Sequence, residues 1–212
     1  MKNIPVFTTE NGVATLILKE IPEQQMAYVM IRDSLEPEKL LGECRDFCVA
    51  CGAERVFATG HEILERYPFY TAMWRMQCDR AALPDTDAAL WPVQEKTLER
   101  WREIYNEKVR RVPNGAWMSI LDSKEMLKKG DGYFIHRGEE LLGIGRASGE
   151  MLDWVAAVKP GAGRDVVLAL NHALAGDLAV LTVASVNEKA VKLYENLGFL
   201  RNQELSVWYQ IK

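Results

Sequence analysis

The sequence predicts an α+β fold in which helices flank a mixed central sheet, preceded by a smaller αβ domain. The chain has 212 residues, 48% of them hydrophobic and 26% charged, a composition typical of a globular protein with its own core. Apolar segments of strand length alternate with helical segments along the whole chain. A small, polar, proline-containing stretch at 81–87 predicts a boundary between one domain over residues 1–80 and another over 88–212.

The first domain reads as short strands around one long helix. Pro37 in the first turn and Gly52 after the end predict a helix over 37–50. Residues 61–67 make about two helical turns before Pro68. The expected strands are 15–18, 27–31, 55–58 and 70–78.

The second domain carries a longer series of elements. An apolar stripe at helical spacing predicts a helix over 95–109, and shorter helices are expected over 123–127, 165–174 and 188–197. Segment 151–158 is nearly all apolar, so we expect a strand buried on both faces. The other expected strands are 90–93, 133–136, 141–146, 179–183 and 205–211.

Charge and targeting signals limit the classes of partner. The net charge is -4 and the pI about 5.5, and no segment combines clustered Lys and Arg with aromatic residues as a nucleic-acid surface does. No apolar run has signal-peptide or bilayer-spanning length. We therefore expect a cytoplasmic protein that binds neither nucleic acid nor a membrane.

Three of the four cysteines fall on one face of the helix over 37–50 or at its end. Cys44, Cys48 and Cys51 are spaced four and three apart, which allows either a metal or thiol site or a set of core thiols. A well-spaced fourth ligand and a neighbouring histidine are missing from the sequence. We expect reduced, buried thiols, since free cysteine is among the most buried residue types.

A glycine-rich turn, 159–163, leads from the strand at 151–158 into a helix. Gly161 and Gly163 let the main chain approach a ligand, and Lys159 and Arg164 add positive charge. A helix N-terminus of this kind can bind a phosphate or pyrophosphate. A purely structural turn is the alternative, because glycine commonly joins a strand to a helix.

The segment 182–199 is the most informative of the sequence. Asn187 can cap the helix that follows. Ala190, Val191, Tyr194 and Leu197 lie along one face of that helix. Taken alone, this pattern also fits an amphipathic helix with a core tyrosine.

The residues from Asn187 to Phe199 resemble the last sequence block of GNAT acyltransferases, in which a strand ends, an Asn opens a helix, and an Ala-x-x-Leu-Tyr-Glu-x-x-Gly-Phe pattern follows. The order of expected elements over 90–212 is also similar to that fold. The resemblance implies an enzyme that moves an acetyl or other acyl group directly from acetyl-CoA to an amine of a small molecule or peptide. No covalent enzyme intermediate is implied.

The resemblance also implies roles for individual residues. Tyr194 would protonate the departing CoA thiolate, and Glu150 would act as the base, with Asp153 as the second candidate. A strand amide would stabilise the developing oxyanion, and Trp117 and Met118 fall where the family lines its acceptor site. The residues implied for cofactor binding are Trp154, Val155, Ala156, Ala157, Val158, Gly161, Ala162, Gly163, Arg164, Asp165, Asn187, Ala190 and Tyr194.

The sequence departs from the GNAT pattern in two ways, which leave alternative functions open. The glycine turn is shorter than the family pattern, and Asp165 could cap the helix itself and repel a phosphate. A non-catalytic acyl-CoA-binding or protein-interaction module is therefore the alternative function. The expected order helix, strand, helix, strand over 37–78 is similar to that of the second half, so residues 1–80 are a possible degenerate GNAT half, although any αβ unit has a similar order. That half lacks a glycine turn, so we expect it not to bind its own cofactor. Our hypothesis is that it shapes the acceptor pocket or pairs protomers in a possible homodimer.

Overall fold

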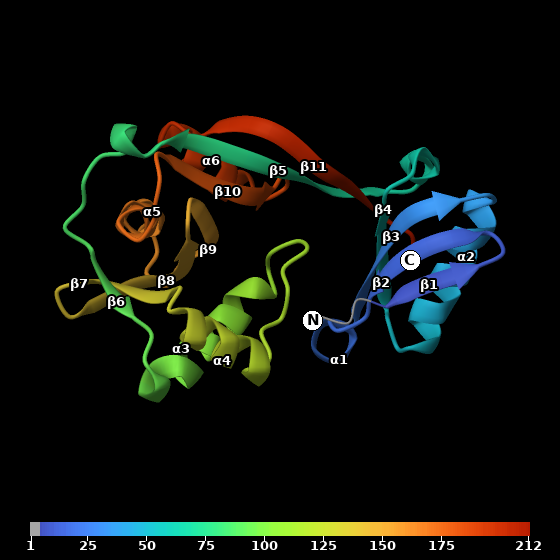
Figure 1. Cartoon of the computed structure of the whole chain (residues 1–212), viewed down its shortest axis with the longest axis horizontal. Coiled ribbons are helices and arrows are strands. Elements are labelled where there is room, and N and C mark those ends of the chain that lie inside the picture. The colour runs from blue at the N-terminus through green and yellow to red at the C-terminus, as the bar shows by residue number, and fades with distance from the viewer. Residues whose placement is uncertain (1–4) are drawn as a thin grey trace. The chain divides into compact units, whose positions relative to one another are not determined.

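The structure, a computed structural model, describes residues 5–212. Contacts between Cα atoms divide the chain into two units (Figure 1). The first contains the described residues up to Met73 together with Leu205–Lys212, and the second contains Trp74–Glu204. In the part of the chain that is described, no helix is long and apolar enough to cross a membrane.

The first unit is a sheet covered by one long helix. Strands β1, β2 and β3 pair antiparallel, and β3 pairs parallel with β4 over five residue pairs. The helix α2 packs on this sheet through Leu40, Leu41, Cys44 and Cys48. The elements of this part of the chain are β1 (Val6–Thr9), β2 (Gly12–Ile17), α1 (Ile21–Gln24), β3 (Met26–Ser34), α2 (Pro37–Ala50), β4 (Arg55–Thr59), the 3₁₀ helix η1 (Glu62–Arg66) and β5 (Phe69–Asp79), which continues into the second unit.

The second unit is a larger mixed sheet. Strands β6 to β9 form an antiparallel series, and β9 then pairs parallel with β10. The elements are the 3₁₀ helix η2 (Arg80–Ala82), β6 (Ala89–Pro92), α3 (Glu95–Val109), α4 (Ile120–Lys129), β7 (Gly132–Arg137), β8 (Glu140–Ser148), β9 (Met151–Ala157), α5 (Gly163–Asn171), β10 (Leu178–Ala184), α6 (Glu188–Asn196) and β11 (Leu200–Gln210), whose last residues belong to the first unit.

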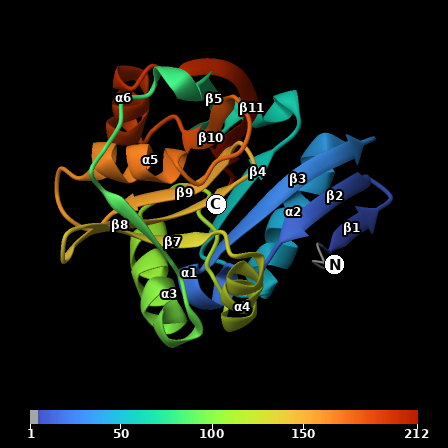
Figure 2. The same cartoon turned by 60° about the vertical axis from the view of Figure 1, so that its left-hand side comes forward.

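Helices cover both faces of this second sheet (Figure 2). The helices α3 and α4 bury one cluster of apolar side chains around Trp101, Met126 and Ile144. The helices α5 and α6 bury another on the opposite face. Glycine in β8 lets α5 approach closely, because a Cβ at Gly145 would lie 2.3 Å from Cδ1 of Leu170. Likewise, a Cβ at Gly143 would lie 2.5 Å from Cγ2 of Val166, so the first half of α5 also packs directly on β8.

The strand order reveals a repeat in the chain. The hydrogen-bonded order is β1-β2-β3-β4-β11-β5-β10-β9-β8-β7-β6. Apart from the short helix α1 between β2 and β3, the series β1, β2, β3, α2, β4, η1, β5 has the same order of elements as β7, β8, β9, α5, β10, α6, β11. The last strand of each series is exchanged: β11 pairs beside β4, and β5 pairs beside β10. This topology supports the hypothesis of a degenerate N-terminal half.

The expected α+β class is confirmed, and the helices over 37–50 and 95–109 have the expected bounds. The division of the chain differs from the expected boundary, because β5 and β11 each run through both units. The stretch 81–87 consequently lies inside the second unit. Strand β1, which was not expected, is a short and largely exposed edge strand.

The prediction that the strand at 151–158 is buried on both faces is wrong. Leu152 and Ala156 are buried, whereas Asp153 is exposed and Trp154 and Val155 are half-buried. Apolar composition predicts a buried strand only when neighbours cover it on both sides. The exposure has a structural cause, because β9 pairs with β10 over only two residue pairs.

Candidate active site

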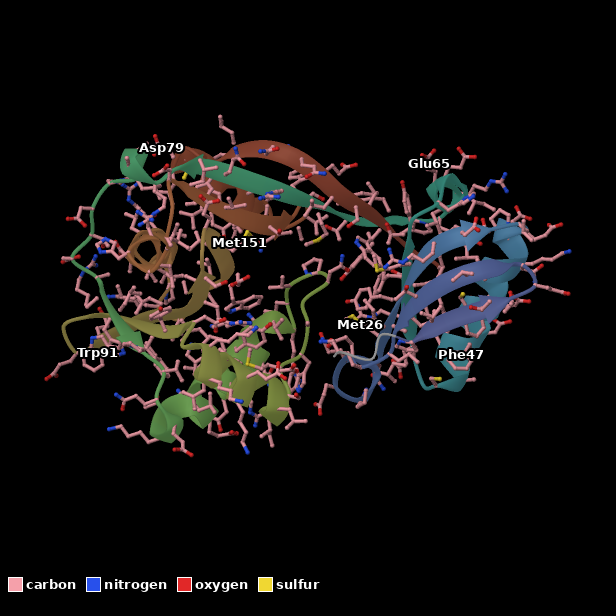
Figure 3. All side chains as sticks on the ribbon, viewed as in Figure 1. Met26, Phe47, Glu65, Asp79, Trp91 and Met151 are labelled. Atoms are coloured by element: carbon pink, nitrogen blue, oxygen red, sulfur yellow. The ribbon has the colours of Figure 1, made fainter. Side chains whose placement is uncertain are left out.

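The strands β9 and β10 separate soon after they meet. Met151, labelled in Figure 3, pairs with Val180, and Leu152 pairs with Leu181. Beyond these two pairs, residues 153–157 of β9 continue along β8 alone, and the last residues of β10 leave the ladder. The backbone edge of β9 that would have faced β10 is therefore open to hydrogen bonding by a ligand.

A β-bulge coincides with this separation. Trp154 pairs with Arg146 and Leu152 pairs with Ala147, so Asp153 is the additional residue on β9. Side chains normally alternate between faces, but across the bulge Leu152 and Val155 both pack with the α5 cluster, and Trp154 packs on the α3 face. Bulges are enriched next to active sites, because they redirect a side chain and end a ladder.

The turn after β9 carries the chain to the N-terminus of α5. The amides of Val158 and Lys159 both donate to the carbonyl of Leu142, which anchors the turn to β8. Gly161 has φ +85°, and a Cβ built there would meet no atom within 4 Å. Within residues 5–212, the amides of Gly163, Arg164 and Asp165 donate to no protein acceptor. These three donors at a positive dipole end suit an anion.

The expectation that Asp165 could cap α5 is not met. Its Oδ1 lies 3.0 Å from a terminal nitrogen of Arg137, at the end of β7. The same guanidinium contacts Asp87 at 2.8 Å. The two carboxylates, Asp87 first and then Asp165, raise the pKa of Arg137 by hydrogen bonding. Asp165 is thus held by an ion pair, and the first turn of α5 stays uncapped by it.

The helix α6 begins at Asn187, as expected. The Asn187 side chain accepts a hydrogen bond from the amide of Ala190 at 3.4 Å. A Cβ at Gly163 would lie 3.1 Å from Cδ2 of Leu193, so the first turn of α5 packs on α6 one residue before Tyr194. The fold therefore brings the glycine turn and the helix that carries Tyr194 into contact.

Tyr194 is 7% exposed and packs with the apolar cluster that includes Phe199. Burial raises the pKa of its phenol to about 12. In the described part of the chain no hydrogen bond to its hydroxyl is found. A phenol of this pKa stays protonated throughout the physiological range, so Tyr194 can only donate its proton there.

The two candidate bases have different positions. Glu150 lies before β9, its carbonyl accepts from the amide of Val180, and its side chain packs against Gly176. Asp153 is the bulge residue itself, and its Oδ2 accepts from Ser148 Oγ at 2.7 Å. Glu150 therefore lies at the paired end of β9 and β10, whereas Asp153 lies where the strands separate.

The α3 face of the bulge is aromatic. The rings of Tyr105 and Trp154 are 4.6 Å apart, and the Tyr105 hydroxyl donates to the carbonyl of Ala116. Asn106 exchanges two hydrogen bonds with the backbone of Met118, which fixes the loop between α3 and α4. The indole nitrogen of Trp154 is buried without a partner among residues 5–212. Trp117 is half-buried, under the guanidinium of Arg110.

Sequence reasoning missed Arg137, Tyr105 and Asn106. An Arg at a hairpin turn, and a Tyr or Asn on a helix, are common at surfaces and in cores, so nothing in the sequence alone distinguishes them. Their partners lie on other elements and become visible only in the folded chain. Tyr105 and Asn106 nevertheless set the loop that carries Trp117 and Met118.

Three of the four cysteines, Cys44, Cys48 and Cys78, are buried. Cys44 and Cys48 are buried, and burial raises the pKa of each thiol to about 12. Cys51 is exposed at the end of α2, so the expectation of burial is wrong for that residue, which faces away from the sheet. Among the described residues, no three His, Cys, Asp or Glu side chains are grouped to hold a metal.

Comparison with known proteins gives structural likeness only. No protein-family model and no curated protein matches the chain. A functionally unknown conserved protein from Staphylococcus epidermidis is 10% identical, with TM-score 0.62, and the match covers 98% of this chain and 93% of that one.

Two structures similar to this chain are acetyltransferases or related proteins by name. A GCN5-related N-acetyltransferase from Kribbella flavida is 10% identical, with coverage of 97% and 88% and TM-score 0.56. A tandem GNAT protein from the clavulanic acid biosynthesis pathway is 13% identical, with coverage of 94% and 78% and TM-score 0.53. At such identities the likeness establishes the fold. The chain has the GNAT fold.

Proposed function

We propose that this protein is an N-acyltransferase that moves an acetyl group from acetyl-CoA to an amine of a small molecule or a peptide. The observation that carries the proposal is the separation of β9 from β10 after two residue pairs, directly before the uncapped first turn of α5. An open strand edge can hold an extended, amide-containing chain by backbone hydrogen bonds, and a free helix N-terminus can hold a pyrophosphate.

The residues present fit this donor. The amides of Gly163, Arg164 and Asp165 would hold the pyrophosphate, with Arg164 adding positive charge, since the chain offers it no ion pair within residues 5–212. The open edge of β9, from Trp154 to Ala157, would hold the pantetheine arm, whereas the amide of Val158 is taken by the carbonyl of Leu142. Asn187 and Ala190 would contact the donor from the start of α6. The bound donor supplies the activated acetyl group for transfer.

At the amine, a base has to remove a proton, because a protonated amine has no lone pair with which to attack. We assign this role to Asp153, whose carboxylate lies on the bulge at which the strands separate. Glu150 is the second candidate, since it lies at the closed end of the same strand pair. An amide on the open edge of β9 would stabilise the negative charge that develops on the carbonyl oxygen.

At the departing sulfur, Tyr194 would donate a hydrogen bond. Its pKa of about 12 exceeds that of an ordinary thiol, which is about 8.5. Complete proton transfer from Tyr194 to the thiolate is therefore unfavourable, whereas a hydrogen bond to the thiolate leaves the phenol protonated. The role of Tyr194 is then to stabilise the developing thiolate, with solvent supplying the proton after release.

The test combines binding and turnover. Thermal melting of the full chain with and without acetyl-CoA should show an upward shift, since a ligand that binds only the folded state stabilises it. Release of free CoA should be followed against a panel of amines and peptides, with the Tyr194→Phe variant beside the unchanged protein. Absence of any shift at millimolar acetyl-CoA would rule out the proposed donor.

A non-catalytic acyl-CoA-binding or interaction module is the second candidate. The observation that favours it is the short turn before α5, in which Val166, Val167 and Leu168 are buried core residues where the family has more glycine. A thermal shift with acetyl-CoA, without CoA release on any amine of the panel and with no effect of Tyr194→Phe, would favour this candidate.

A further inference from the structure

We propose that Arg137 is a positioning residue for the acyl donor: it holds the carboxylate of Asp165 away from the first turn of α5, so that the free amides of that turn can bind a pyrophosphate. The inference rests on the proposed function. It concerns a residue of the β7–β8 hairpin that would itself stay off the reacting atoms.

The geometry of Arg137 is well defined. It ends β7 and pairs with Glu140 across the hairpin turn, where Gly138 has φ +58°. Its Nε and one terminal nitrogen both contact Asp87 Oδ1 at 2.8 Å, and that terminal nitrogen also lies 3.0 Å from Asp165 Oδ1. One guanidinium thus links the stretch before β6 to the pyrophosphate-binding end of α5.

Asp165 would compete with a ligand if it were released. It is the third residue of α5, and a carboxylate in the first turn is attracted by the helix dipole and by free amides. Such a carboxylate would satisfy the same donors that a pyrophosphate needs, and its charge would repel the ligand. The ion pair with Arg137 gives Asp165 another partner and offsets part of its charge, since Asp87 shares the same guanidinium.

A purely structural role would explain little of this arrangement. Asp87 and Arg137 are 71% and 42% exposed, and ion pairs at such surfaces contribute little to stability. The side chain of Asp165 is 27% exposed, so it is not a core residue that requires a partner. The charge balance at the α5 N-terminus is what the pair changes most.

The experiment is a double-mutant cycle on donor affinity. Isothermal titration gives the Kd for acetyl-CoA of the unchanged chain, Arg137→Gln, Asp165→Asn and the double variant. Arg137→Gln should raise Kd about 5- to 20-fold. The released carboxylate of Asp165 would then accept hydrogen bonds from the first-turn amides or repel the pyrophosphate that binds them. The double variant should return to within about threefold of the unchanged chain, since the competing charge is gone.

Controls separate this effect from general changes. Arg100→Gln removes the same charge from an exposed pair on α3 and should leave Kd within about twofold. Arg137→Lys should retain most of the affinity, because an ammonium still gives Asp165 a cationic partner.

Equal affinity in Arg137→Gln and the unchanged chain would overturn the inference. So would a double variant as weak as Arg137→Gln, which would mean that the loss does not act through Asp165. If the unchanged chain itself binds no acetyl-CoA, the proposed function fails, and the inference fails with it. The two failures are therefore distinguished by the first titration alone.

Discussion

The parallel pair β3–β4 and the parallel pair β9–β10 occupy the same place in the two repeated series, yet they differ at the point where a ligand would bind. The first pair stays together through five residue pairs, from Met26 with Arg55 to Met30 with Thr59. The second separates after two. An unbroken ladder satisfies the backbone groups internally, whereas a broken one leaves them for a ligand.

The helices that follow β3 and β9, which are α2 and α5, also differ in how many backbone amides they leave for a ligand. Before α2, the amides of Leu35 and Glu36 both donate to the carbonyl of Asn11, and Pro37 contributes no amide. Glu36 and Glu38 make that end acidic. In the first turn of α5 three amides, those of Gly163, Arg164 and Asp165, find no acceptor among residues 5–212, against those of Glu38 and Lys39 alone in α2. Asp165 is held by Arg137, which it shares with Asp87. The comparison teaches that one topology can be closed or opened to an anion by changes in a few residues at the strand ends.

The largest expected effect is at the bulge of β9. Strand β3 also has a bulge, against β2, but its additional residue is Arg32, which cannot act as a base as Asp153 can. Asp153→Asn should lower the rate of CoA release about 100-fold or more, because general-base catalysis contributes about 10²–10⁴. Glu150→Gln should change it less than about threefold. Steady-state assays with the best amine of the panel measure both. The reverse order of effects would transfer the role of base to Glu150.

A matched charge reversal compares the two helix starts. Arg164→Glu, in the first turn of α5, should weaken acetyl-CoA binding about 10- to 50-fold, because it replaces attraction with repulsion at a phosphate site. Lys39→Glu, in the first turn of α2, should leave the Kd unchanged. Titration of both variants provides the readout. Similar losses of acetyl-CoA affinity in the two variants would indicate a long-range effect of charge instead of a local binding site.

Helix α6 carries Tyr194, whereas η1, at the matching place in the first series, contains no tyrosine and ends at Arg66, before Tyr67. Tyr194→Phe should lower kcat about 10-fold through loss of a hydrogen bond to the thiolate, with the Kd for acetyl-CoA unchanged. Rapid-quench or steady-state CoA release measures it. An unchanged kcat would remove Tyr194 from the chemistry and leave it as a core residue.

The same phenol predicts a difference in alkaline stability. Burial raises its pKa to about 12 in the folded protein, against about 10 in an unfolded chain. The folded state thus holds the proton more tightly. This contribution to stability is complete below about pH 10 and is lost as pH rises toward 12. Denaturant melts between these values should fall less steeply for Tyr194→Phe than for the unchanged protein, since both share all other groups.

The smallest effect concerns the closed helix start. Asn11 is 6% exposed, and its side chain donates to Glu43 at 2.7 Å. Asn11→Ala should lower the free energy of unfolding by about 1–2 kcal/mol, because a partly buried carboxylate loses a partner. Chemical denaturation measures the loss, and acetyl-CoA binding should be unaffected. A changed Kd would contradict the assignment of Asn11 to a purely structural role.

Local signals in the sequence predicted the helices and most strands. Pro37 and Gly52 bracket α2, and Asn187 caps α6 as its side chain suggested. These signals act within a few residues, so a sequence contains them in full. The glycine turn and the tyrosine helix are likewise recognisable in the sequence, because each is a continuous segment.

Features that depend on distant partners were not predictable. The exposure of Asp153 follows from the departure of β10, about thirty residues later in the chain. Asp165 forms an ion pair with Arg137, on another element, instead of capping its own helix. Periodicity and composition describe one segment at a time, whereas these outcomes require two segments to meet.

The exchange of β5 and β11 has a consequence for how the chain can be divided. A fragment ending near residue 80 would lack β11, the neighbour of β4, and a fragment starting there would lack β5, the neighbour of β10. Each would expose an unpaired strand edge, which favours aggregation. Deleting the N-terminal half therefore cannot report on its function, because the deletion also removes a strand from the remaining sheet. Complementation by the two separately made fragments is the suitable experiment, and the pairing of Ala58 with Tyr209 implies that folding is completed only after synthesis of the last strand.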